Sequence, residues 1–188
     1  MLRMLMTASL VCLVALSASM MVSATADEGL CKGDPIDAFY VTKVAGAEDD
    51  GIDEGESLCY RCRYGSRPMV MVFAQQTGQK VTELVKQIDS AVADNADAQL
   101  RGLVTMFGAE TARLTDSATK LAGQADPQNV PIVVSKDSEA GPSSYRLNQD
   151  VEITVVVASD SQVVARHEFS ADSLDVAAVM SEVKSMLN

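Results

Sequence analysis

The chain has 188 residues, with 26 acidic against 15 basic side chains and a formal net charge of −11. Nucleic acids and anionic membrane surfaces bind clustered positive charge, so this composition argues against both as partners. Tryptophan is absent and aromatic residues make up only 4% of the chain, which argues against stacking platforms for sugars or bases and leaves a core of aliphatic side chains.

The first 26 residues have the pattern of a secretory signal peptide. Arg3 is their only charged residue, an apolar run follows over residues 4–24, and the run closes on the small-x-small sequence Ala24-Thr25-Ala26. We expect cleavage after Ala26, which removes 26 of 188 residues and leaves 162, with 14 basic and 26 acidic side chains. The chain would then be secreted or periplasmic, with no stable membrane anchor. A retained anchor is the alternative, since 21 uncharged residues are long enough to span a bilayer.

The segment after the leader predicts an irregular arm, a strand and an acidic loop. The arm covers residues 27–37, and the β-prone stretch AFYVTKV covers residues 38–44. The loop at residues 45–57 carries six carboxylates between Glu48 and Glu56. It lacks the D-x-D-x-D-G spacing of a calcium-binding loop, so a solvated loop is the preferred interpretation.

Strands alternate with amphipathic helices in the middle of the chain. Residues 68–74 (PMVMVFA) form a continuous apolar run, as expected for a strand that is buried on both faces. A helix opens at Thr77 and Gly78, and its apolar residues follow the i, i+3, i+4, i+7 spacing of one buried face. Three further elements are a strand at residues 100–107, a helix at 110–125 and a strand at 130–135.

The last third of the chain predicts a hairpin and a helix. A polar connection at residues 136–150 precedes two β-prone stretches, residues 152–158 and 162–169, which flank the turn Ser159-Asp160-Ser161. The final helix has apolar residues spaced by four, three and four, namely Val176, Met180, Val183 and Leu187. Together the elements predict an α/β fold, with a central sheet covered by helices on both faces.

This element order, finishing with a hairpin and a helix, resembles that of the thioredoxin-like superfamily and is most similar to its peroxiredoxin-like (AhpC/TSA) branch. The similarity spans residues 38–187 and rests on the element order and on stretches such as RPMVMVFA and ITVVVASDSQVVARHEF. It implies a thioredoxin-like domain at residues 38–188, with a central mixed sheet and helices on both faces. It also implies thiol–disulfide redox chemistry, with a protein thiol or disulfide as partner.

The chain departs from the family at the reactive cysteine. The resemblance puts that residue just after the first central strand, at the N-terminus of the next helix, where the helix dipole lowers the pKa of a thiol. Residues 75–79 (QQTGQ) occupy this position and contain no cysteine. Thioredoxins also have a cis-proline just before the final hairpin, where this chain has Asp150, Val151 and Glu152. Both usual catalytic features are therefore missing.

A C-x-x-C pair, Cys59 and Cys62, lies before the strand instead of after it. Arg61 and Arg63, with Arg67 nearby, are candidate stabilisers of a thiolate, because neighbouring positive charge lowers the pKa of a thiol. The strand that follows would span about 20 Å, at about 3.3 Å per residue. We therefore expect the pair near the opposite end of the sheet from the family's usual site.

The cysteines allow three interpretations. In an oxidising compartment, a structural disulfide could join Cys59 to Cys62 or staple one of them to Cys31. A redox-active dithiol is the second, and a zinc site formed by the three cysteines with His167 is the third. No motif indicates a cofactor, and we expect no bound metal. The sequence thus predicts an exported thioredoxin-fold protein that exchanges disulfides through a displaced C-x-x-C. The alternative is a non-catalytic binding or scaffold module with structural disulfides.

Overall fold

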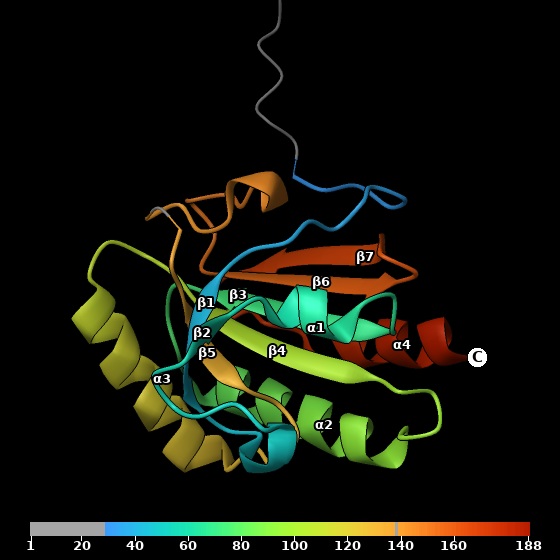
Figure 1. The fold of residues 1–188 in the computed structure, drawn as a ribbon. Helices are drawn as coiled ribbons and strands as arrows, with labels where there is room; N and C mark the ends of the chain where they lie inside the picture. The colour runs from blue at the N-terminus through green and yellow to red at the C-terminus, as the bar shows by residue number, and fades with distance from the viewer. Residues whose placement is uncertain (1–28, 138) are drawn as a thin grey trace, which may run out of the picture.

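The computed structural model describes residues 29–137 and 139–188 (Figure 1). The predicted signal peptide, residues 1–26, lies outside the described residues. The strands are β1 (Val41–Ala45), β2 (Ser57–Leu58), β3 (Met69–Ala74), β4 (Arg101–Met106), β5 (Ile132–Ser135), β6 (Ile153–Ser159) and β7 (Gln162–Phe169). The helices are α1 (Tyr60–Tyr64), α2 (Gln79–Asp94), α3 (Thr111–Ala125) and α4 (Val176–Leu187), with short 3-10 turns η1 (Glu48–Asp50) and η2 (Ser143–Tyr145).

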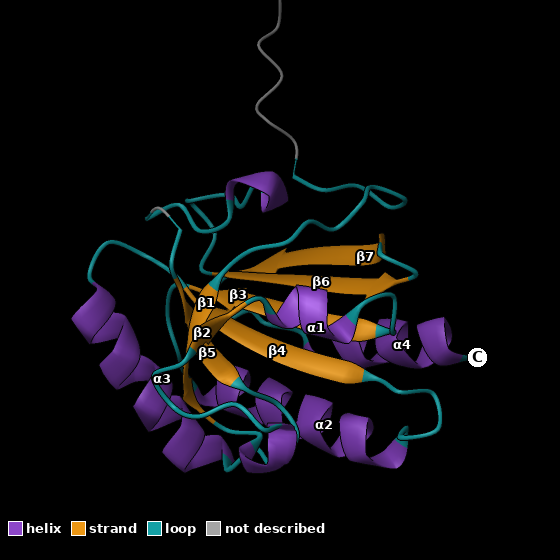
Figure 2. Ribbon diagram, viewed as in Figure 1, coloured by secondary structure: helices purple, strands orange, loops and turns teal. Residues whose placement is uncertain are grey.

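The described strands form one seven-stranded mixed sheet in the order β2-β1-β5-β4-β3-β6-β7 (Figure 2). The central strands β3, β4 and β5 are parallel. The hairpin β6–β7 joins β3 antiparallel at one side, and β1 and β2 complete the other side in antiparallel pairs. All six residues of β3 are buried, which confirms that its continuous apolar run belongs to a strand covered on both faces.

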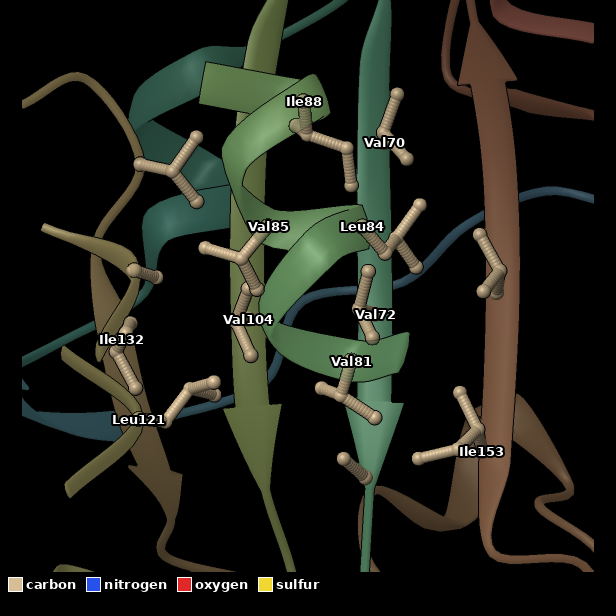
Figure 3. Close-up of a cluster of buried hydrophobic side chains, with 14 of the residues drawn as sticks. Val70, Val72, Val81, Leu84, Val85, Ile88, Val104, Leu121, Ile132 and Ile153 are labelled. Carbon is tan, nitrogen blue, oxygen red and sulfur yellow. The ribbon is translucent and has the colours of Figure 1, made fainter. Parts of the chain in front are cut away.

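Within the described residues, the three long helices α2, α3 and α4 pack on one face of this sheet. Figure 3 shows α2 lying over β4 and β3, with Val81, Leu84 and Val85 close to Val72 and Val104. Residues two apart in a strand face the same side, so Val70 and Val72 of β3, with Val104 of β4, meet the apolar stripe of α2. The helical periodicity therefore predicted the buried face of α2 correctly.

The opposite face is covered by α1, the N-terminal arm (residues 29–37) and the connection around η2. Aromatic side chains fill much of this layer: Phe39, Phe73 and Tyr145 contact one another, with ring centroids between 4.9 and 5.6 Å apart. The Tyr145 hydroxyl donates a hydrogen bond of 2.9 Å to the carbonyl oxygen of Asp37. Helices lie on both faces, as predicted, but the face that carries the cysteines is covered mainly by irregular chain.

Two elements differ from the sequence expectation. β2 and α1 occupy residues 57–64 and have only two and five residues, too few for a recognisable periodicity.

The predicted hairpin is present, and Asp160 and Ser161 form its turn with φ of 53° and 65°, the left-handed values that a tight hairpin turn requires. In residues 29–137 and 139–188, no helix combines the length and apolar composition needed to cross a bilayer.

Candidate functional site

Cys59 and Cys62 form a disulfide, with their Cα atoms 5.2 Å apart. Cys59 directly follows β2 and is the N-cap residue of α1. The backbone N–H of Cys62 donates a hydrogen bond of 3.1 Å to the Cys59 sulfur, so this sulfur satisfies one of the free N–H groups of the first helical turn. The C-x-x-C spacing therefore lets the Cys59 sulfur both cap the first turn of α1 and bond to the Cys62 sulfur.

The two half-cystines differ in exposure. Cys62 is exposed, whereas only 9% of Cys59 is accessible to solvent. Cys31 is exposed and free, and its thiol donates to the Gly29 carbonyl oxygen at 3.7 Å. Of the two disulfide arrangements considered from the sequence, the structure forms Cys59–Cys62, and the staple through Cys31 is not formed.

Two buried tyrosines hold α1 against the sheet. The Tyr60 hydroxyl donates to Asp50 Oδ2 at 2.6 Å, and the Tyr64 hydroxyl donates to the Gly102 carbonyl at 3.2 Å. Burial raises the pKa of Tyr60 above its ordinary value, and the hydrogen bond to Asp50 raises it further. Burial likewise raises the pKa of Tyr64. Both tyrosines therefore stay protonated and act as hydrogen-bond donors over a wide pH range.

Asp50 connects α1 to a buried lysine. Lys43, in β1, is only 3% exposed and donates to Asp50 Oδ1 at 2.8 Å and to the carbonyls of Ala47 and Ile52. Burial tends to raise the pKa of Asp50, but the hydrogen bonds from Lys43, Tyr60 and the Ile52 N–H outweigh it and hold the pKa below its ordinary value. Asp50 is thus an anchor for α1, whereas the other five carboxylates of its loop are exposed, as expected for a solvated loop.

The arginines beside the disulfide contact backbone carbonyls. Arg61 Nε donates to the Ile36 carbonyl at 3.1 Å, and Arg63 Nη2 donates to the Asp50 carbonyl at 2.6 Å. Arg67 Nη1 donates to the Tyr64 carbonyl at 2.9 Å. Each guanidinium is fixed in place near α1 by these hydrogen bonds. In the described part of the chain, none of these donors is hydrogen-bonded to a cysteine sulfur.

The chain that carries the disulfide runs between the two ends of the sheet. Leu58, just before Cys59, pairs with Val41, which in turn pairs with Ser135 at the carboxyl end of β5. Tyr64 contacts Gly102, which pairs with Val70 near the start of β3, and Arg67 Nε donates to Gln99 just before β4. Residues 75–79 follow the carboxyl end of β3, about 20 Å from the amino end of this strand at about 3.3 Å per residue. The chain therefore crosses the face of the sheet between Leu58 and Met69, and α1 with its disulfide lies on this crossing (Figure 1). The predicted place at the amino-terminal ends of the strands holds for Tyr64 and Arg67 after the pair, and not for Leu58 before it.

The segment where the resemblance places a reactive cysteine, residues 75–79, borders a hollow and contains no cysteine. A cavity of about 430 Å³ lies there, lined by residues that include Gln75, Gln76, Thr77 and Arg113. Among residues 29–137 and 139–188, no group of three histidine, cysteine or acidic side chains is arranged to hold a metal ion. Cys59 and Cys62 are joined to each other, so the zinc set proposed with Cys31 and His167 does not form here.

The sequence reasoning missed the cluster of Lys43, Asp50 and Tyr60. A signal was available, because Lys43 lies two residues after Val41 in a β-prone stretch, and residues two apart point to the same face. Val41 is fully buried in the core. A lysine at the next inward position needs a carboxylate partner, since a buried unpaired charge is strongly unfavourable. The acidic loop that follows could have supplied that partner.

No family model matches the chain, and no curated protein matches it. Several solved structures, in contrast, share the fold of this chain. The thioredoxin domain of a thiol-disulfide oxidoreductase from Bacteroides vulgatus has 10% identity and a TM-score of 0.62, over 85% of this chain and 99% of that one. AhpC of Mycobacterium bovis has 13% identity and a TM-score of 0.62, over 85% and 93% of the two chains. A secreted disulfide oxidoreductase of Mycobacterium tuberculosis, homologous to E. coli DsbE, has 9% identity and a TM-score of 0.55, over 78% and 95%. The fold is therefore thioredoxin-like, and AhpC of the peroxiredoxin-like branch is among the structures that share it.

Proposed function

We propose that this thioredoxin-fold chain is an exported thiol–disulfide exchange protein that acts through Cys59 and Cys62. The observation that carries the proposal is the asymmetry of their disulfide. Cys62 is exposed, whereas Cys59 is buried and its sulfur accepts the backbone N–H of Cys62. Exchange needs one sulfur that a thiolate can reach and another that leaves readily, and this pair has one of each kind.

The reaction begins when a substrate thiolate attacks the Cys62 sulfur. The Cys59–Cys62 bond breaks, Cys59 leaves as a thiolate, and a mixed disulfide joins the substrate to Cys62. A second thiolate of the same substrate then attacks the substrate sulfur of the mixed disulfide and releases Cys62. The substrate dithiol is oxidised by two electrons and the pair is reduced by two, while the two substrate protons pass to Cys59 and Cys62.

Groups already in place favour Cys59 as the leaving thiolate. The Cys62 N–H is directed at the Cys59 sulfur, and a hydrogen bond to the charged form of a group lowers its pKa. Arg61 and Arg63 add positive charge on either side of Cys62 without contacting either sulfur. A leaving thiol with a lower pKa leaves faster, so these groups accelerate opening of the disulfide.

The short loop of this disulfide also favours exchange over a structural role. The cysteines are separated by 3 positions, and a loop this short gives a chain-entropy stabilisation of only about 2 kcal/mol, against about 3 kcal/mol for a 15-residue loop. A staple from the N-terminal arm to α1 through Cys31 would close a longer loop and stabilise more. The chain instead leaves Cys31 free.

Single-cysteine variants test the proposal. In a Cys31→Ser background, Cys59→Ser leaves only the exposed Cys62 thiol, and Cys62→Ser leaves only the buried Cys59 thiol. With an activated peptide disulfide as probe, we expect the Cys59→Ser protein to form the mixed disulfide at least about tenfold faster, because its thiol is accessible. Equal rates, or a faster reaction at Cys59, would contradict the proposed order of attack.

Export is part of the proposal and has its own support. The leader ends in Ala24-Thr25-Ala26, and the proteins of similar fold include one described as secreted. We expect the protein recovered from an exporting host to begin at Asp27, which intact-mass measurement detects. A product that retains Arg3 in the membrane fraction would instead support the retained anchor.

A non-catalytic binding or scaffold module is the second candidate, and one observation favours it. The usual cysteine position of the fold, residues 75–79, carries no cysteine although a hollow remains there. In this case Cys59–Cys62 would stabilise α1 only. The disulfide would then stay oxidised in glutathione buffers that reduce known oxidoreductases.

A further inference from the structure

A surface hollow of about 460 Å³ lies beside α1, and three arginines from different parts of the chain line it. Arg63 belongs to α1, Arg67 to the loop that follows, and Arg101 is the first residue of β4. Arg63 is the neighbour of Cys62 in the chain, and consecutive Cα atoms are about 3.8 Å apart. The lining of the hollow therefore includes the residue that directly follows the exposed cysteine in the chain.

The arginines of this hollow have no carboxylate partners in the described part of the chain. Arg63 donates to a backbone carbonyl, and Arg67 donates to the Gln99 side chain and to backbone carbonyls. Arg101 lies over the Tyr64 ring, with its guanidinium carbon 6.0 Å from the centroid. No side-chain hydrogen bond of Arg101 occurs within residues 29–137 and 139–188. Its five N–H donors are thus available to a ligand.

Local charge in the hollow is opposite to that of the whole molecule. Two carboxylates also line it, but Asp50 is neutralised by Lys43, and only the exposed Asp49 is left to oppose three guanidinium groups. The chain as a whole carries a formal charge of −11. A gathering of unpaired arginines in so acidic a protein has no role in balancing the fold's own carboxylates, and guanidinium groups bind carboxylates in bidentate geometry.

We infer that this hollow is a subsite for the carboxylate of an acidic peptide whose cysteine reacts at Cys62. The inference rests on the proposed exchange function and adds its substrate class: a peptide thiol or disulfide with an Asp or Glu close to the cysteine. Arg101 and Arg63 pair with the carboxylate, and Arg67 supplies further positive charge from the rim. The exchange step is the one already described, with the same bonds broken and formed.

The opposing charges of hollow and molecule make the inference testable. The net negative charge of the chain repels an acidic peptide at long range, so without a local subsite an acidic thiol would react more slowly than a basic one. With the subsite, the acidic thiol should react faster than the basic one. The substrates are two blocked peptides, each with one cysteine, flanked by two Glu in one and two Lys in the other. Each rate is divided by the rate of the same peptide with a neutral small-molecule disulfide, which removes differences in thiol pKa.

We expect the oxidised Cys31→Ser protein to react about fivefold faster with the acidic peptide than with the basic one at low ionic strength. Arg101→Gln should abolish this preference, so that the acidic peptide no longer reacts faster than the basic one. Arg113→Gln is the matched control, because Arg113 is exposed in α3 at the other end of the sheet and its loss changes the net charge equally. A basic preference, or equal effects of the two substitutions, would overturn the inference.

Binding without chemistry separates this inference from the proposed function. The acidic peptide with serine in place of cysteine should bind the oxidised protein saturably in a chemical-shift titration, and the binding should be lost in Arg101→Gln and kept in Arg113→Gln. Absence of binding overturns the subsite. Inorganic phosphate that binds the hollow as tightly as the peptide also overturns it, because the site would then serve a free anion. If no thiol of any charge opens the disulfide, the exchange function fails, and with it the assignment of a substrate.

Discussion

Asp50→Asn tests the anchor that holds the disulfide-bearing helix to the sheet. The substitution keeps an acceptor oxygen for Tyr60 but leaves the Lys43 ammonium, which is 3% exposed, without a counter-charge. Removal of one partner of a buried ion pair costs about 3–5 kcal/mol, and the remaining carbonyl partners of Lys43 reduce this to about 2–3 kcal/mol. For a domain of this size the midpoint of thermal unfolding should fall by about 5–10 °C.

Urea unfolding of the oxidised protein at neutral pH measures this loss. Asp49→Asn is the control, because Asp49 is the exposed neighbour and undergoes the same chemical change; its effect should stay within about 0.5 kcal/mol. Lys43→Met and the double variant complete a cycle, in which we expect a coupling of about 1–2 kcal/mol. Equal midpoints for Asp50→Asn and Asp49→Asn would refute the reasoning.

The pH dependence follows from the lowered pKa of Asp50. The folded carboxyl binds its proton less readily than the unfolded one, whose ordinary pKa is 3.8, so the folded state is favoured above this pH. The stability is lost as the pH falls through the lower folded value. The difference between the wild-type chain and Asp50→Asn should therefore shrink as the pH falls below about 4. A difference that does not change with pH would contradict the role of the charge.

Two further predictions concern the disulfide and the tyrosines. Replacement of Cys59 and Cys62 together by serine should lower stability by no more than about 2 kcal/mol in urea unfolding, because the loop is short; a loss well above this would favour a structural staple. Burial raises the pKa of Tyr60, Tyr64 and Tyr145 above 10.0, so their folded forms keep a proton that the unfolded chain releases. Stability should fall above pH 10 by about 1.4 kcal/mol per pH unit for each such tyrosine. Tyrosinate absorbance and circular dichroism should then change together, and ionisation of these three side chains without loss of structure would refute the burial argument.

The sequence predicted the long elements because their patterns reflect burial directly. The apolar run of β3 and the stripe of α2 correspond to a central strand and to one buried helix face, and both elements begin within one or two residues of the predicted start. β1 is shorter than expected, since Val41 is its first paired residue. The element order was enough to predict the thioredoxin-like fold.

The candidate site was predictable in part only. Cys59, Cys62 and the nearby arginines stand out in the sequence, but the strand length could not show that Leu58, just before the pair, lies level with the carboxyl end of β5. The disulfide partner was undetermined, because the distance from Cys31 depends on how the arm packs. α1 is one short helix fixed by tertiary contacts of Tyr60 and Tyr64, which leave no local pattern. The approach of Arg101 to Arg63 likewise depends on sheet topology.

The reduction potential of the Cys59–Cys62 pair tests the proposed exchange function most directly. The purified mature protein, with Cys31→Ser to remove the third thiol, is equilibrated in glutathione or dithiothreitol buffers, and its free thiols are counted by mass spectrometry. We predict a potential above about −270 mV, within the range of known oxidoreductases, because Cys62 is exposed and the Cys59 thiolate is stabilised. A potential below about −300 mV would mark a structural disulfide and contradict the proposal.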